Sequence, residues 1–171
     1  MRNLISRRFL SVLIAGNLVM RPSHTRALPI TRDKTVLTIS GRIETHSESK
    51  VVWFDRSMLE ALGTQGFATT NPWYDGRTRF DGILMRTLLR SVGASGSHVI
   101  ATALNDYTTN IPITDFEQYD VLLALKRDGV YMPVRDKGPL FIVYPFDSNK
   151  LLQSQTYYGR CAWQVSELIV G

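Results

Sequence analysis

Short apolar segments separated by turn-forming residues recur along most of this 171-residue chain, and they constrain its fold more than any other feature. Alternation of apolar and polar residues over a few positions, bounded by turn residues, is typical of β-strands. The pattern predicts strands at 36–43, 51–54, 98–104, 121–126, 130–132, 140–144, 161–165 and 168–170, although 51–54 also fits the approach to a helix. Because helices are few and no strict strand–helix–strand alternation occurs, we expect one strand-rich α+β domain with a mixed sheet and short helices.

Capping patterns predict where two of these helices begin. Ser57 is followed by Glu60 in a capping box, which predicts a helix over 57–62 that ends at Gly63. Thr114 and Glu117 form a second capping box and predict another short helix or turn. The stretch 148–156 that precedes the last strands is polar.

The stretch from Phe67 to Leu89 combines two patterns. Its first half predicts a polar loop that carries Trp73 among threonine, asparagine and arginine residues. In its second half, Leu84 and Leu88 have helical spacing, and Gly93 lies where such a helix would end. Loops on a rigid scaffold often carry binding residues, so we interpret the first half as facing a ligand. The alternative is a surface turn whose tryptophan packs partly on the core.

The first 27 residues have the features of a secretory signal peptide. Arginines at positions 2, 7 and 8 precede an apolar run at 9–20 that is too short to span a membrane, and Ala27 offers a small residue for cleavage. Ser6–Leu10 is close to a twin-arginine signal, with one residue missing between Arg8 and Phe9. We therefore expect export to the periplasm and cleavage near Ala27, which leaves one domain at 28–171.

The net charge of +5 belongs to that segment. Five of the 20 basic residues and none of the 15 acidic ones lie within residues 1–27, which leaves 15 basic against 15 acidic residues in the mature chain. A formally neutral domain gives no argument for nucleic-acid binding.

The sequence lacks the usual metal and nucleotide motifs. His46 and His98 lie far apart without paired ligand spacing, and no glycine-rich loop opens a helix. Cys161 is the only cysteine, so an intramolecular disulfide is excluded. The neighbouring Arg160 could lower the pKa of its thiol, but a lone cysteine in a strand is more often a small buried hydrophobe, and we interpret Cys161 in that way.

Aromatic, amide and charged side chains gather in the polar loops around 71–75 and 105–110. Aromatic faces beside hydrogen-bonding groups suit a flat heterocycle with polar edges. The alternative is that each aromatic ring only covers the end of the sheet.

The order of several short motifs resembles the sulfite-oxidase-like molybdopterin-binding domain. These motifs are Thr69–Trp73, Phe80–Leu84 with Leu88-Leu89 and Gly93-Ala94, Ala103–Tyr107 with Ile111-Pro112, Asp120–Ala124, and Gly138–Leu140 with Val143–Pro145. The resemblance covers about residues 34–170 and is strongest with small exported members that consist of this domain alone. It implies an α+β fold with a mixed sheet around a pterin pocket.

Catalytic members of this family bind molybdenum through a cysteine, and the matching place in this chain falls at about Thr70. A threonine hydroxyl is a poor replacement for a soft thiolate ligand. After Pro139, where the family binds phosphate, the only basic residues are Lys150 and Arg160. We therefore predict that a pterin binds without molybdenum. The predicted contacts are Thr70, Asn71, Trp73, Asn105, Asp106, Tyr107 and Arg160.

Some small exported members of this fold resemble pterin-binding sensors that act on a membrane signalling protein controlling cyclic di-GMP. The resemblance implies such a regulatory role here, with the periplasmic domain of a membrane-bound signalling enzyme as partner. Two alternatives stay open at this point: a molybdopterin-dependent oxidoreductase, and an interaction module that binds no small ligand.

Overall fold

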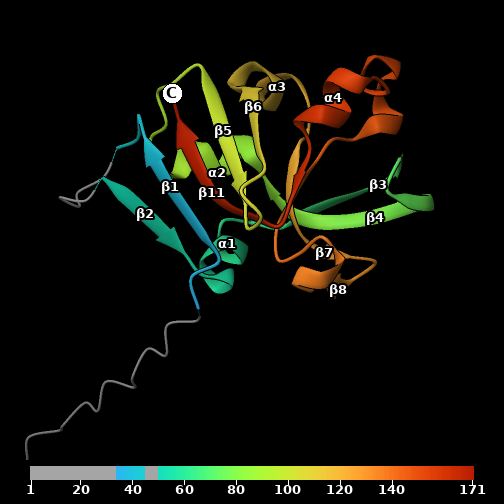
Figure 1. The fold of residues 1–171 in the computed structure, drawn as a ribbon, viewed down its shortest axis with the longest axis horizontal. Coiled ribbons are helices and arrows are strands. Elements are labelled where there is room, and N and C mark those ends of the chain that lie inside the picture. The colour runs from blue at the N-terminus through green and yellow to red at the C-terminus, as the bar shows by residue number, and fades with distance from the viewer. Residues whose placement is uncertain (1–33, 45–49) are drawn as a thin grey trace, which may run out of the picture. The chain divides into compact units, whose positions relative to one another are not determined.

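The computed structural model describes residues 34–44 and 50–171, which form two β-sheets and several short helices (Figure 1). The expected signal peptide, its cleavage site and His46 lie outside the described residues. The first sheet has the strand order β2–β1–β11–β5–β6. Its strands are β1 (Leu37–Gly41), β2 (Val51–Phe54), β5 (His98–Ala103), β6 (Thr108–Pro112) and β11 (Val165–Val170). Because β1 runs parallel to β11 and the other neighbours pair antiparallel, this sheet is mixed, as predicted.

The second sheet has the order β10–β9–β7–β4–β3, with β8 paired to β7, and is antiparallel throughout. Its strands are β3 (Gln65–Asn71), β4 (Tyr74–Leu84), β7 (Leu122–Arg127), β8 (Val130–Tyr131), β9 (Phe141–Val143) and β10 (Ala162–Trp163). The predicted Asp128-Gly129 turn joins β7 to β8, and both residues have the positive φ that such a tight hairpin turn requires. The prediction of a strand-rich α+β domain is confirmed.

Short helices connect the strands: α1 (Arg56–Ala61), α2 (Met85–Ser91), α3 (Ile113–Gln118), α4 (Gln155–Arg160), and the 3-10 turns η1 (Val134–Asp136), η2 (Phe146–Ser148) and η3 (Lys150–Leu152). Within the described ranges, no helix has the length and apolar character that crossing a membrane requires. A hydrophobic core joins the inner faces of both sheets, and its largest fully buried side chains include Tyr144, Phe80, Phe116, Phe141 and Phe146.

The prediction of a polar loop in the first half of Phe67–Leu89 is wrong, because this stretch is the β3–β4 hairpin. Its inward positions include Thr69 and Thr78, which pair across the hairpin and are 1% and 4% exposed. Threonine suits a strand but hides the alternation on which a strand prediction depends. The predicted helix is real but begins only at Met85, because Leu84 still pairs with Leu122 in the sheet. It ends at Ser91, and Gly93 follows just beyond the cap with φ +57°, close to the expected end.

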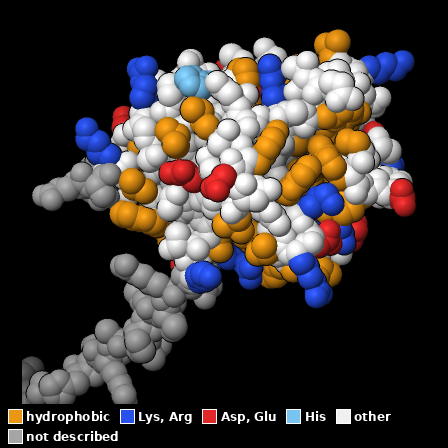
Figure 2. All heavy atoms as spheres, viewed as in Figure 1, with side chains coloured by type: hydrophobic (Ala, Val, Ile, Leu, Met, Phe, Trp, Pro, Cys, Tyr) orange, Lys and Arg blue, Asp and Glu red, His pale blue; other side chains and the backbone are white. Residues whose placement is uncertain are grey.

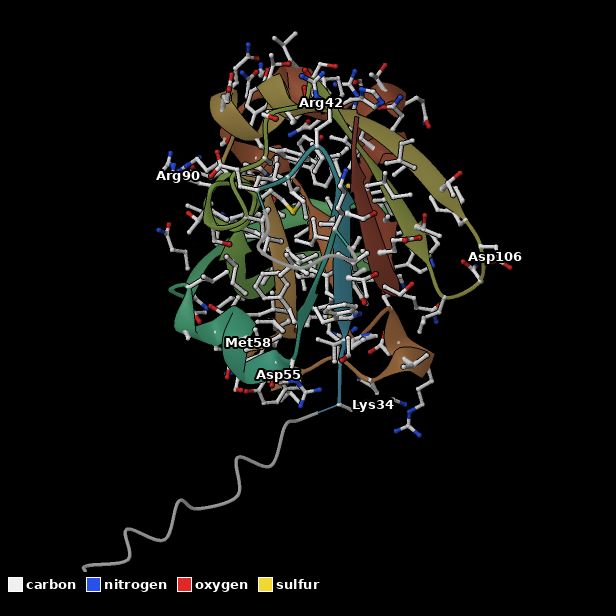
Figure 3. The ribbon with its side chains drawn as sticks, turned by 90° about the vertical axis from the view of Figure 1, so that its left-hand side faces the viewer. Lys34, Arg42, Asp55, Met58, Arg90 and Asp106 are labelled. Carbon is white, nitrogen blue, oxygen red and sulfur yellow. The ribbon has the colours of Figure 1, made fainter. Side chains whose placement is uncertain are left out.

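Two predicted helix starts also need correction. The side chain of Asp55, not of Ser57, accepts the Met58 N–H and caps α1, and the Ser57 hydroxyl donates to Asp55 (Figure 3). In the second case Thr114 lies inside α3, which follows directly on β6. Helix α4 was not predicted at all, since its sequence carries no apolar stripe and none of its residues is fully buried.

Candidate functional site

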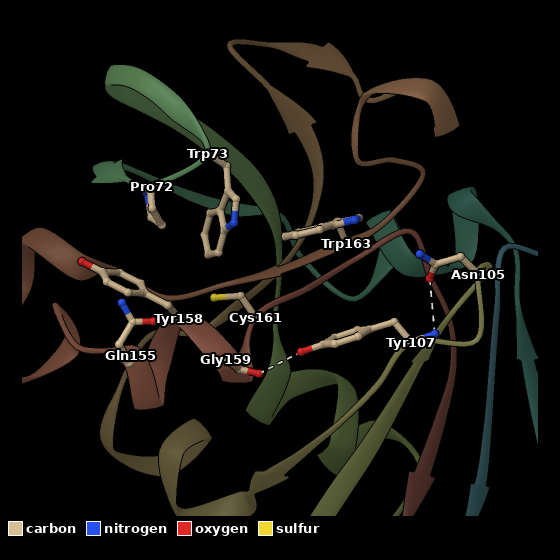
Figure 4. A pocket seen from close by; sticks show the side chains of 9 residues that line it. All are labelled: Pro72, Trp73, Asn105, Tyr107, Gln155, Tyr158, Gly159, Cys161 and Trp163. Atoms are coloured by element: carbon tan, nitrogen blue, oxygen red, sulfur yellow. Dashed lines mark hydrogen bonds between the residues drawn. The ribbon is translucent and has the colours of Figure 1, made fainter.

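A cleft of about 460 Å³ opens beside α4, close to the turn between β3 and β4 (Figure 4). Figure 2 shows hydrophobic side chains gathered between α4 and that hairpin. The lining residues are Pro72, Trp73, Asn105, Tyr107, Gln155, Tyr158, Gly159, Cys161 and Trp163. Its volume suits a small ligand, and none of these nine side chains carries a charge at neutral pH.

Trp73 forms the wall that joins the cleft to the core. Its ring meets those of Phe141, Trp163 and Tyr158 edge-on, with centroids 5.3, 5.9 and 6.3 Å away. The ring of Phe146 lies 6.1 Å away on the core side. Such edge-to-face contacts orient the rings of the cleft relative to one another. Trp73 packs on the core, as the alternative interpretation expected, and it also lines the cleft, while its contact with a ligand stays a prediction.

The carboxyl end of α4 is held in place by polar contacts. The carbonyl of Gly159 accepts hydrogen bonds from the hydroxyls of Tyr107 at 3.2 Å and Thr109 at 2.8 Å. Arg160 pairs with Asp115 at 2.7 Å, and the same carboxylate oxygen accepts the Tyr144 hydroxyl at 2.6 Å. These bonds fasten α4 to β6, α3 and the core. They thereby set the position of the wall that carries Tyr158.

Asp115 and Tyr144 form the buried part of this attachment, with 4% and 0% exposure. Burial, together with the hydrogen bond to the charged Asp115, raises the pKa of the Tyr144 hydroxyl well above its ordinary value. Tyr144 therefore remains a neutral hydrogen-bond donor at any pH at which the protein functions.

Cys161 is a buried thiol at the floor of the cleft. It is 2% exposed, and its Sγ lies 3.5 Å from the carbonyl of Tyr157, to which it donates. Burial raises the pKa of the thiol above its ordinary value, so it stays protonated at neutral pH. The interpretation of Cys161 as a small buried hydrophobe is confirmed.

Three of the seven predicted site residues line the cleft: Trp73, Asn105 and Tyr107. The side-chain oxygen of Asn105 accepts the Tyr107 N–H at 3.3 Å, and this leaves its amide NH₂ as a donor (Figure 4). Asp106 does not line the cleft. It lies at the tip of the β5–β6 turn with φ +63° and is exposed there (Figure 3).

The other three predicted residues support the structure around the cleft. The hydroxyl and N–H of Thr70 both donate to Asp147, which also pairs with Arg77, so Thr70 fastens β3 to η2. The side-chain oxygen of Asn71 accepts the N–H groups of Trp73 and Tyr74, each at 3.1 Å, and thereby shapes the hairpin turn. The guanidinium of Arg160 binds Asp115 rather than facing the cleft.

The sequence prediction missed six lining residues: Pro72, Gln155, Tyr158, Gly159, Cys161 and Trp163. Three of them lie on α4, which was not predicted. The pair Tyr157-Tyr158 in an otherwise polar stretch was the signal that could have pointed to them.

A comparison with known protein families shows to which family the chain belongs. Residues 34–147 match the family described as oxidoreductase molybdopterin binding domain. The chain belongs to this family. The resemblance seen in the sequence motifs is therefore confirmed. No curated protein matches the chain. The family match ends at residue 147, so five of the nine lining residues of the cleft lie beyond it: three on α4, one on β10, and Cys161 between these two elements.

The family implies molybdopterin, and the residues of the cleft fit only part of that group. A flat pterin ring would meet aromatic walls and the amides of Asn105 and Gln155 there, whereas the Gly159 carbonyl already accepts two hydroxyls. For the metal the donors are unsuitable. Thr70 is bound to Asp147, Cys161 is a buried thiol, and no group of three His, Cys, Asp or Glu side chains within 34–44 and 50–171 could hold an ion. The nine lining side chains also offer no cation to the phosphate.

Proposed function

We propose that this protein binds a pterin ring in the cleft beside α4 and serves as a regulatory sensor rather than as a molybdenum enzyme. The observation that carries this proposal is the uncharged aromatic lining, which also includes the side-chain amides of Asn105 and Gln155. A pterin has an apolar face and an edge of alternating donors and acceptors. Trp73, Tyr107, Tyr158 or Trp163 covers the face, while the side-chain amides of Asn105 and Gln155 meet the edge.

Specific recognition follows from this division of roles. A ligand with the wrong edge leaves the amide groups of the cleft unpaired on binding, which costs more than an unmade bond in water. Stacking on an aromatic wall adds about 0.5–1.5 kcal/mol beyond the area that it buries.

Calorimetric titration with oxidised and reduced pterins tests the proposal, with one tryptophan pair as matched variants. Trp163 lines the cleft and is 36% exposed, whereas Trp53 is 49% exposed and lies on β2, in the other sheet. We expect Trp163→Ala to weaken pterin binding about tenfold or more, which corresponds to about 1.4 kcal/mol, and Trp53→Ala to leave it unchanged. Trp73→Ala is a less informative variant because Trp73 also packs on Phe141 and Phe146.

The outcomes of this titration separate the candidate functions. Folded wild-type protein that binds no pterin would remove the proposal and leave an interaction module without a small ligand. Stoichiometric molybdenum in protein purified from its native source would restore the alternative of a molybdopterin-dependent oxidoreductase. Thermal melts of both tryptophan variants identify any loss of binding that comes from loss of folding.

We also propose that the protein is exported and acts on a membrane-bound signalling enzyme. Export to the periplasm is supported by the signal-like residues 1–27. Intact-mass measurement of the exported protein tests it. An exported chain that still begins at Met1 would contradict cleavage near Ala27. The control of cyclic di-GMP is supported by the resemblance to small exported pterin sensors. If it is correct, replacing the wild-type protein by Trp163→Ala changes cellular cyclic di-GMP; an unchanged level would argue against this role.

A further inference from the structure

Two cations described near lining residues of the cleft make contacts with other groups. Arg160 pairs with Asp115 at 2.7 Å, and its guanidinium lies 5.1 Å from the centre of the Tyr157 ring. Lys137 lies over the ring of Tyr74 at 4.5 Å and farther from that of Trp163, at 6.0 Å. None of the side chains that line the cleft is charged. The site therefore presents dipoles and aromatic faces to its ligand, and no fixed positive charge.

A phosphate ester needs more than such a site offers. At neutral pH a phosphate monoester carries close to two negative charges and three strong acceptor oxygens, and proteins usually meet it with arginine, lysine or a row of backbone N–H groups. In the cleft the carbonyl of Gly159 is itself an acceptor, and the amides of Asn105 and Gln155 donate only as neutral groups. Moving a phosphate from water into this lining would remove its hydration without providing a counter-charge.

We infer that the cleft selects pterins whose side chain is uncharged and discriminates against phosphorylated pterins, including the phosphate-bearing cofactor of its own family. This inference rests on the proposed pterin binding and names the ligand class of that same site. The elements α4 and β10, which supply Gln155, Gly159 and Trp163, lie outside residues 34–147, which match the family. These elements form an uncharged wall of the cleft.

The test compares neopterin with its phosphate monoester, titrated calorimetrically into the folded full-length protein at pH 7.5 and one ionic strength. We expect the ester to bind at least tenfold more weakly than neopterin. Gln155→Arg introduces a cation into the lining and should reduce the difference to threefold or less. Gln155→Met, of similar length but neutral, should weaken the binding of both compounds alike and so keep the tenfold ratio between them. If Gln155→Arg does not fold in a thermal melt, Asn105→Lys takes its place.

Several results would overturn the inference. Wild-type protein that binds the ester as tightly as neopterin, or more tightly, removes the selectivity but leaves the proposed function standing. If ester binding is strong and is lost in Lys137→Met, then Lys137 leaves Tyr74 and provides the counter-charge that the inference denies. Binding of neither compound by folded protein removes both the inference and the proposed function.

Discussion

Removing the Asp115 carboxylate should destabilise the protein more than removing the carboxylate of any other described ion pair. Asp115 is 4% exposed, and one of its oxygens accepts both the Arg160 guanidinium and the Tyr144 hydroxyl. Asp115→Ala leaves the cation of Arg160, whose side chain is 24% exposed, without its carboxylate, and leaves the buried Tyr144 hydroxyl without its acceptor.

The expected loss follows from these two defects. Breaking a buried ion pair by removing one partner costs about 3–5 kcal/mol, and a buried hydroxyl without a partner costs about 1–3 kcal/mol. The two losses share one carboxylate and are not additive, and Arg160 keeps some access to water. We therefore expect Asp115→Ala to lower the free energy of unfolding by about 3 kcal/mol.

Urea unfolding followed by circular dichroism measures this free energy, and Asp120→Ala provides the matched control. Asp120 pairs with Arg86 at 2.6 Å, but the two side chains are 63% and 33% exposed, so this loss should cost about 0.2–1 kcal/mol. A double-mutant cycle with Tyr144→Phe then separates the hydroxyl contribution from the ion pair. If Asp115→Ala costs no more than Asp120→Ala, the buried carboxylate does not fasten α4 and the reasoning is refuted.

Three further predictions concern the reactivity of the Cys161 thiol, the loss of stability at acidic pH, and Thr70, which lies where catalytic members carry the metal-binding cysteine. The folded protein should react with a thiol reagent at pH 8 far more slowly than the unfolded chain, because Cys161 is 2% exposed and burial raises its pKa; equal rates would contradict this. The hydrogen bond from Thr70, with the nearby charge of Arg77, lowers the pKa of Asp147 in the folded state. Its contribution to stability is therefore present above the unfolded pKa of about 4 and is lost as the pH falls through the folded pKa. Asp147→Asn should therefore reduce the drop in the free energy of unfolding between neutral and acidic pH. A drop equal to that of the wild type would speak against this. Thr70→Cys should lose the hydroxyl bond to Asp147 and still purify without molybdenum, as measured by elemental analysis. The reason is that a single thiol beside Asp147 and Arg77 supplies neither the other metal ligands nor a phosphate site. Stoichiometric metal in this variant would contradict the prediction.

Local patterns were sufficient for the elements whose buried side chains are apolar. The alternation in β5 and the Asp128-Gly129 turn between β7 and β8 are signals contained within a few residues. In the β3–β4 hairpin this signal fails because a buried position is occupied by Thr69, whose hydroxyl accepts the backbone N–H of Asp147 at 3.0 Å. The hydrogen bond to a residue 78 positions away satisfies the buried threonine hydroxyl. A prediction from neighbouring residues in the sequence cannot include that partner.

For the candidate site, the sequence alone determined the family, the threonine near the expected metal-binding place, and three of the lining residues. It did not determine α4, a short helix without fully buried residues, whose end is fastened by contacts with Asp115, Tyr107 and Thr109. Nor did it reveal that Arg160 binds Asp115 while Gly159 beside it lines the cleft. Side-chain periodicity and capping act over a few residues and can be read from a sequence. The charge and shape of the cleft depend on which distant side chains bind each cation, and only the tertiary structure decides that.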